Sequence, residues 1–408
     1  MEEEKKHSNL KVVWYVLFAI ITVILVYLFI VVYFFYISPY NISVKTSIWP
    51  FLSDQTVGEM YLDATVEINF TVADEVTFED EEKSVVGVNV RQDGYVIAPY
   101  NEFRSCTEDT QITILANSGK VYNGKLLFGD MTYNIAILKC ENVTADEGAV
   151  KIPFVSISNA VNYSWFFETD VLAISSPMKS KTIWKGTVSD TNLYNVYKEI
   201  QIENKYAIDF VMEDCYLVDV PDIGEESFEG GAIFDKSGGI LGLSFEQTEE
   251  GDYVIMPISS AKLFLSDVVK AYRNETKYEN ELVASLVGFD QSELQCFFIA
   301  SNTNYGEEEF FYFNGTWQVY TDEIVVDFAN STTPGYYVFE DWVYDGETIL
   351  SAGNVISSIR CGYKTYSAGQ KITLMEGLYN ADAGDVVTVY YYNISSLGGT
   401  INSVTFTV

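Results

Sequence analysis

The clearest pattern in the chain is a long uncharged stretch near its beginning. Residues Val12 to Val44 contain no charged side chain, and their apolar part is longer than the roughly 20 residues that cross a bilayer as a helix. A cleaved signal peptide would have an apolar region of only about 7–15 residues that ends in small side chains. This stretch instead runs into the bulky aromatic segment Tyr33–Tyr36. The pattern therefore predicts an uncleaved transmembrane signal anchor over residues 12–38.

Beyond a stem predicted over residues 39–60, apolar and polar residues alternate in short runs that are broken by turn residues. Representative runs are ATVEINFTV, SVVGVNV, ITILANSGKVYNGKLLFGD and GGILGLSF. Short strands separated by turns roughly every 8–12 residues are typical of all-β barrels and sandwiches. We therefore predict a mainly β body that begins near residue 61.

Two segments depart from this β pattern. The stretch SSAKLFLSDVVKAYRN has apolar residues at helical spacing, and the polar run NETKYENE that follows it is typical of a linker. A second β-rich block fills residues 281–408. Inside this block, the sequence ITLMEGLYNADAG predicts a short helix.

The composition narrows the classes of function. The chain has 24 Lys and Arg residues against 58 Asp and Glu residues, which gives a formal net charge of −34. A field of this sign repels phosphate backbones, so nucleic acid is excluded as a partner. A hydrophobic content of 48% allows a large buried core, so the chain is not a disordered acidic polymer.

Histidine and cysteine usage restricts the chemistry further. The single histidine, His7, precedes the membrane segment, so the body has no His-dependent base and no His-ligated metal site. Neither a C-x-x-C spacing nor a D-x-D-x-D-G calcium loop is present. We therefore expect no metal and no cofactor. An odd number of cysteines predicts two disulfides and one spare thiol among Cys106, Cys140, Cys215, Cys296 and Cys361.

Charges and sequons predict the topology. Lys5, Lys6 and Lys11 precede the apolar stretch and only Lys45 follows it closely, so the tail over residues 1–11 is predicted to be cytosolic. Eight N-x-S/T sequons all follow the apolar stretch, which is typical of a luminal or extracellular body. Their asparagines are Asn41, Asn69, Asn142, Asn162, Asn274, Asn314, Asn330 and Asn393. We predict a single-pass type II glycoprotein of the endomembrane system or the plasma membrane.

Five segments of the body stand out, in this order: SVVGVNVRQDGYVIAPYNEF, GKVYNGKLLFGDMTYNIAILK, ETDVLAISSPMKSKTIWKGTVSD, SFEGGAIFDKSGGILGLSF and VIMPISSAKLF. Together they resemble the trypsin-like serine proteases of the HtrA/Deg family. The family pairs a two-barrel protease domain with PDZ modules. The resemblance implies a trypsin-like domain over residues 61–275, built from two six-stranded antiparallel β-barrels.

The same resemblance locates the three positions of the catalytic triad, and each carries another residue. The histidine position falls on Asn101, the aspartate position on Asn134, and the serine position, before a Gly-Gly pair, on Glu229. The serine mechanism needs a hydroxyl that is activated by an imidazole held by a carboxylate. An amide accepts no proton at neutral pH, and Glu229 has no hydroxyl. The alternative nucleophile, Ser227, still lacks a histidine, so we predict a pseudoprotease whose three positions meet at the cleft between the barrels.

The stretch ILSAGNVISSIRCGYKTYSAGQKITLMEGLYNADAGDVVTVYYYN carries a second resemblance, to PDZ domains. It implies a PDZ-like domain over residues 281–408, whose carboxylate-binding loop is formed by Leu286, Val287, Gly288 and Phe289. Such domains bind a peptide as an added strand, with the terminal carboxylate held by loop amides. The alternative for this block is an immunoglobulin-like or other β-sandwich.

These predictions favour a catalytically inactive membrane protein that binds a protein or peptide, as a scaffold, a sequestering protein or a regulator of an active relative. The second predicted partner is the lipid bilayer, which the chain contacts through one transmembrane helix. HtrA-like proteins tend to trimerise, so the resemblance also implies a possible homo-oligomer. Two alternatives stay open. One is an active serine-type endopeptidase with an atypical site, and the other is a surface adhesin or structural glycoprotein that uses the β-domains as spacers.

Overall fold

The computed structural model contains one long N-terminal helix and a mainly β body. It describes residues 2–33, 40–48, 52–73, 80–130, 133–143, 152–157, 170–175, 182–202, 205–221, 231–235, 238–248, 251–287, 296–299, 310–313, 316–319, 335–338, 341–367, 371–393 and 401–408.

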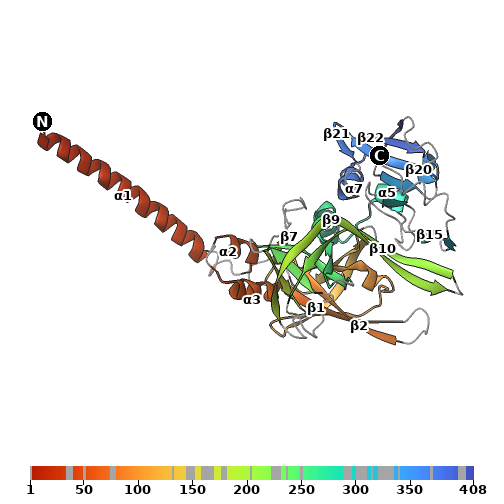
Figure 1. Ribbon diagram of the computed structural model, residues 1–408, viewed down its shortest axis with the longest axis horizontal. Coiled ribbons are helices and arrows are strands. Elements are labelled where there is room, and N and C mark those ends of the chain that lie inside the picture. Colours follow the sequence, from red (N-terminus) through yellow and green to blue (C-terminus); the bar gives the residue numbers. More distant parts are fainter. Residues whose placement is uncertain are drawn as a thin grey trace.

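Helix α1 (Glu2–Val32) extends away from the body (Figure 1). Its segment Val12–Val32 is long and apolar enough to cross a membrane, and none of it is buried against the described parts of the chain. The predicted apolar helix is therefore confirmed. A signal sequence near an N-terminus has the same properties, so the helix alone does not distinguish an anchor from a signal.

Two short helices occupy the segment where the sequence predicts a stem. They are α2 (Ile42–Ile48) and α3 (Asp54–Ala64). The ring of Tyr61, on α3, stacks on Phe234 of the second barrel with ring centroids 4.3 Å apart. Ile42, on α2, is buried as well. The chain after residue 40 is therefore packed into the body, because these apolar side chains complete its core.

The first barrel is closed by six antiparallel strands in the order β1-β2-β3-β6-β5-β4. On β1, the alternate residues Val66, Ile68 and Phe70 are buried in its core, as expected for a strand with one face turned inward. The strands are β1 (Thr65–Ala73), β2 (Asp80–Asn89), β3 (Tyr95–Pro99), β4 (Ile112–Ala116), β5 (Val121–Asp130) and β6 (Ile135–Cys140). The predicted strand alternation is confirmed here.

The second barrel is closed in the order β11-β8-β9-β10-β13-β12, with β12 pairing back onto β11 and the short β7 (Ser156–Ile157) lying parallel to β12. Gly242 on β12 allows this closure, because a Cβ there would overlap the Met256 carbonyl of β13. The strands are β8 (Asp170–Ile174), β9 (Ile183–Ile202), β10 (Lys205–Asp219), β11 (Ala232–Asp235), β12 (Gly239–Gln247) and β13 (Tyr253–Pro257). Two closed six-stranded antiparallel barrels fit the trypsin-like double-barrel fold that the sequence predicted. The long β9–β10 hairpin extends beyond its barrel (Figure 1).

The C-terminal block follows the helical turn η4 (Ser259–Leu263), helix α4 (Leu265–Arg273) and helix α5 (Glu281–Val287). Its main sheet has the order β14-β17-β20-β22-β23, with β21 paired to β20. The strands are β14 (Cys296–Ile299), β17 (Gly335–Val338), β20 (Asn354–Cys361), β21 (Lys364–Ser367), β22 (Val386–Asn393) and β23 (Asn402–Thr407), with the hairpins β15 (Phe310–Phe313)–β16 (Thr316–Val319) and β18 (Trp342–Tyr344)–β19 (Glu347–Leu350). Helix α7 (Lys371–Tyr379) lies where the sequence predicted a short helix.

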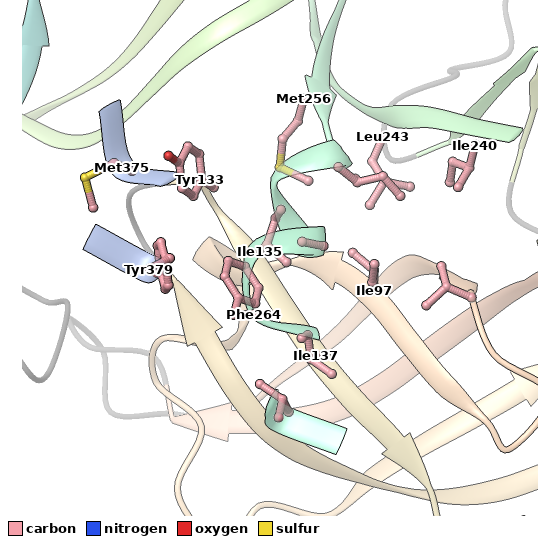
Figure 2. Packing of buried hydrophobic residues seen from close by; sticks show 14 of the residues in the cluster. Ile97, Tyr133, Ile135, Ile137, Ile240, Leu243, Met256, Phe264, Met375 and Tyr379 are labelled. Carbon is pink, nitrogen blue, oxygen red and sulfur yellow. The ribbon is translucent and has the colours of Figure 1, made fainter. Parts of the chain in front are cut away.

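One hydrophobic cluster joins both barrels to the C-terminal block. Figure 2 shows Phe264, which follows η4, close to Ile135 of the first barrel and Tyr379 of α7. The ring of Phe264 lies 4.8 Å from the ring of Phe128 and 5.4 Å from the ring of Tyr379, measured between centroids. The C-terminal block is therefore packed directly on the barrels.

The prediction of two disulfides is wrong, since Cys106, Cys140 and Cys361 are free thiols and the two cysteines that are left cannot form two bonds. The physical reason is their distribution over separate parts of the body. Cys140 is buried in the core of the first barrel and Cys215 belongs to the larger cluster that includes the second barrel. Burial raises the pKa of the Cys140 thiol to about 12, so this thiol is unreactive at neutral pH.

Candidate functional site

The pairing of β3 with β6 brings Asn101 and Asn134 together. Pro99, at the end of β3, lies opposite Ile135, at the start of β6. Asn101 follows β3 in the helical turn η2 (Tyr100–Phe103), and Asn134 immediately precedes β6. Asn101 and Asn134 therefore lie at the same end of the β3–β6 pair.

Asn134 is held by two backbone hydrogen bonds. Its Oδ1 accepts the backbone N–H of Asn101 at 2.6 Å, and its carbonyl accepts the N–H of Tyr100 at 3.0 Å. The side chain is fully buried, and its backbone has a φ of +54°. Asparagine is one of the few residues with a Cβ that adopts this left-handed conformation readily.

The side chain of Asn101 is held by an acidic neighbour. Its Nδ2 donates to Glu102 at 2.7 Å, and the Glu102 carboxylate lies 3.8 Å from the Lys83 ammonium group. The Oδ1 of Asn101 is buried and accepts no hydrogen bond from the described residues. A buried acceptor of this kind costs about 1–3 kcal/mol, so the site keeps a polar atom that the fold itself does not satisfy.

This pair of amides has no acid–base chemistry at neutral pH. Both amides act only as hydrogen-bond donors and acceptors, and His7 is the one histidine of the whole chain. The third predicted position, Glu229, lies outside the described residues. Gly231 is described, and its carbonyl accepts the N–H of Ser244 at 2.8 Å, just before β11 begins.

The loop between β5 and β6 also contacts the C-terminal block, at the end where it leaves β5. Asp130 is fully buried, accepts the N–H of Tyr133 at 2.9 Å and accepts a hydrogen bond from the hydroxyl of Tyr379 on α7. Burial, together with the negative charge of Asp130, raises the pKa of Tyr379 well above its ordinary value. No pattern in the sequence predicts this contact, because nothing local relates two positions that are 249 residues apart.

A cleft of about 1650 Å³ lies between the first barrel and the segment that links the second barrel to the C-terminal block. Its lining includes Phe128 of β5 and Tyr278 of the linker, whose rings are 5.3 Å apart. At the other end of the linker, Arg273 forms an ion pair with the buried Asp93 at 2.8 Å. Although burial opposes it, the guanidinium groups of Arg91 and Arg273 hold the pKa of Asp93 below its ordinary value.

The predicted peptide-binding residues begin at the end of α5. Leu286 is buried with 2% of its surface exposed, and Val287 is the last residue of the helix. Gly288 and Phe289 lie outside the described residues. The α5 residues that line the cleft are instead Val283 and Ala284, one turn earlier.

The sequon asparagines occupy different environments. Asn142, Asn274 and Asn393 are exposed. Asn41 caps α2, where its Oδ1 accepts the N–H of Val44 at 3.1 Å. Asn69 lies in the middle of β1, with a buried Oδ1. The asparagines that lie outside the described residues are Asn162, Asn314 and Asn330.

No protein-family model matches this chain, and no curated protein is found to be similar to it in sequence. The double barrel defines the class of fold, and Asn101 and Asn134 are the two predicted site residues that the structure brings together. Within the described parts of the chain, no group of three or more His, Cys, Asp or Glu side chains is arranged to hold a metal ion.

Proposed function

We propose that this chain is a membrane-anchored, catalytically inactive relative of the HtrA-type proteases that acts by binding a protein or peptide. The observation that carries the proposal is the hydrogen-bonded pair of Asn101 and Asn134 at the positions of the triad base and its orienting acid. The chain has a double barrel and a cleft beside its linker, while the body contains no histidine that could act as the base of a triad. Binding is the activity that such a framework retains.

The chemistry supports inactivity independently of Glu229. A serine becomes a nucleophile only when a neighbouring base takes its proton, and triad members act as a unit. Asn101 stands at the position of the base, and its amide takes no proton. No other histidine replaces it, because the body contains none.

The proposed ligand is an extended peptide segment that adds a strand to the C-terminal block. The order β20, β21, α7, β22 supports a PDZ-like assignment, and α7 packs against β20 and β21. In this assignment Leu286–Phe289 form the loop that holds the terminal carboxylate. The proposed location is luminal or extracellular, supported by α1, the lysines before it and the sequons after it.

Fluorophosphonate labelling of the purified full chain in detergent tests the inactivity. We expect no labelling under conditions that label active trypsin to completion, because these probes need a serine activated by a base. Labelling that disappears in the Ser227→Ala variant would instead establish the active endopeptidase.

Peptide binding to the immobilised full chain tests the binding function. We expect peptides with a free C-terminal carboxylate to bind more tightly than the same peptides with an amidated end, because loop amides hold the carboxylate. Equal and negligible binding of both sets would favour the adhesin or structural glycoprotein.

A further inference from the structure

Strand β23 forms an edge of the C-terminal sheet. Within the described parts of the chain it pairs only with β22, through a continuous register from Val386↔Thr407 to Tyr391↔Asn402. Ser403, Thr405 and Thr407 on its outer face are exposed. The far side of this strand therefore presents a row of backbone N–H and C=O groups that can pair with another strand.

Among the described residues, this edge lacks the features that usually prevent strand pairing. Proteins protect edges with charged side chains, prolines, bulges or a covering element. From Val386 to Val408 the sequence contains no charged residue and no proline, although 20% of the chain is charged. The β22–β23 register has no shift, so no bulge twists the edge away.

The inner face of the edge is apolar. Val404 and Phe406 are half-buried, and the ring of Phe406 lies 5.7 Å from Trp342 and 5.6 Å from Tyr344, measured between centroids. The core beneath the sheet therefore reaches the last strand. An additional strand would cover the part of these side chains that is still exposed.

The sequence of β23 is complementary to itself. In an antiparallel pairing centred on Thr405, each Thr405 lies opposite its copy, Val404 lies opposite Phe406, and Ser403 lies opposite Thr407. The apolar Val404 and Phe406 then meet on the inner face, with Asn402 opposite Val408 beyond them, and hydroxyls meet hydroxyls on the outer face. Pairs of an aromatic with a β-branched residue, and Thr–Thr pairs, are among those that stabilise sheets. A shift by one residue would place inner residues opposite outer ones.

We propose that β23 pairs with β23 of a second copy of this chain, so that two C-terminal sheets form one continuous sheet across a twofold axis. Two copies with a net charge of −34 repel each other over most of their surfaces, and this uncharged edge is where they can approach. A partner chosen for opposite charge would be drawn to the acidic surfaces instead. The C-terminal sheet lies at the end of the molecule opposite α1, so the pairing leaves the helix free (Figure 1).

Cysteine cross-linking of the full chain in membranes tests the register. Thr405→Cys places two thiols opposite each other at the twofold axis, with Cα atoms about 4.5–5.5 Å apart, within disulfide range. The matched control is Ser403→Cys on the same exposed face, whose two copies would lie about 13 Å apart. After mild oxidation we expect a covalent dimer with Thr405→Cys, above the background of the unsubstituted chain, and none with Ser403→Cys. Equal cross-linking of both variants, or of neither, would overturn the proposal.

Charge substitutions at the same position test the association without a covalent bond. Thr405→Lys and Thr405→Glu each place like charges opposite each other, so we expect each variant in detergent to have half the protein mass of the unsubstituted chain by analytical ultracentrifugation. An equimolar mixture of the two variants should regain the full mass. Melting temperatures close to that of the unsubstituted chain would show that the variants fold. A monomeric unsubstituted chain, or variants that stay dimeric, would refute the pairing.

Discussion

Asn134 combines two properties that few residues share. Its backbone has a left-handed φ of +54°, and its side-chain oxygen accepts the N–H of Asn101. Aspartate has the same shape and the same tolerance for this backbone conformation. An asparagine at this position therefore holds the turn with the geometry that an aspartate would give, and it does so without a negative charge.

Replacing Asn134 separates these two properties. Asn134→Ala loses the acceptor, at about 1–3 kcal/mol for an unsatisfied buried N–H, and adds about 1–2 kcal/mol of left-handed strain. Asn134→Gly loses only the acceptor, because glycine adopts this φ without strain. In urea unfolding we expect the free energy of unfolding to be highest for the unsubstituted chain, lower for Asn134→Gly and lowest for Asn134→Ala. If the alanine variant were as stable as the unsubstituted chain, the hydrogen bond would have no structural role.

At the scale of elements, the loop between β5 and β6 is the point where three parts of the fold meet. Asn134 ties it to η2, Asp130 ties it to α7, and Gly129 lets β5 pass under the Tyr100 ring, since a Cβ there would overlap that ring. The position of the asparagine pair is therefore set partly by the C-terminal block. A change in the packing of α7 would reach the site through this loop.

The contact between Asp130 and Tyr379 should contribute measurably to stability. Tyr379→Phe leaves the buried carboxylate without this donor, at a cost of about 1.5–3 kcal/mol for a hydrogen bond to a charged group. The control is the same substitution in an Asp130→Asn background, where the charge is absent and the added cost should be smaller. Identical costs in both backgrounds would show that the two groups are not coupled.

The raised pKa of Tyr379 predicts a dependence on alkaline pH. Above about pH 10 the phenol of the unfolded chain loses its proton, while the native phenol of Tyr379 keeps it. The contribution of Tyr379 to the free energy of unfolding is therefore present below about pH 10 and decreases as the pH rises further. We expect the unsubstituted chain to lose more stability than Tyr379→Phe between about pH 9 and about pH 11. Parallel stability profiles of the two proteins would contradict this assignment.

The elements also show which parts of the structure the sequence predicts. Alternating runs predict the barrel strands, and the helical spacing in SSAKLFLSDVVKAYRN predicts α4, because these patterns are local. Motif resemblance predicts that Asn101 and Asn134 occupy one site. The packing of Tyr61 onto Phe234, the contact of Asp130 with Tyr379 and the free state of the thiols of Cys106, Cys140 and Cys361 depend on how distant segments meet. No local pattern determines those contacts.

At the scale of the whole molecule, topology and fold together restrict where glycans can be attached. The sequons predict a luminal or extracellular body, and the fold then distinguishes among them. Asn142, Asn274 and Asn393 are exposed, whereas Asn69 lies in a barrel strand that pairs on both sides. A glycan on Asn69 would have to fit against the wall of the first barrel, between the strands β2 and β4 that flank β1.

Glycopeptide mass spectrometry of the full chain from a secretory host should therefore find glycans on Asn142, Asn274 and Asn393 and none on Asn69. Each Asn→Gln substitution at the three exposed sites should remove one glycan from the apparent mass, and Asn69→Gln should leave it unchanged. If the body carried no glycan and were digested by protease added outside sealed microsomes, the body would lie in the cytosol. A glycan on Asn69 would contradict the environment described for β1.

The fixed position of Asn41 limits how far the body can lie from the end of α1. Ile42 donates its N–H to the Phe154 carbonyl at 3.0 Å, so the chain is joined to the body almost as soon as it leaves α1 at Val32. The nine residue steps between Val32 and Asn41 span at most about 30 Å. With α1 in a bilayer, the body is confined to a thin layer above the lipid headgroups. If the body binds a protein or peptide as proposed, a segment close to the membrane surface is within its reach, and one presented at the tip of a tall ectodomain is not.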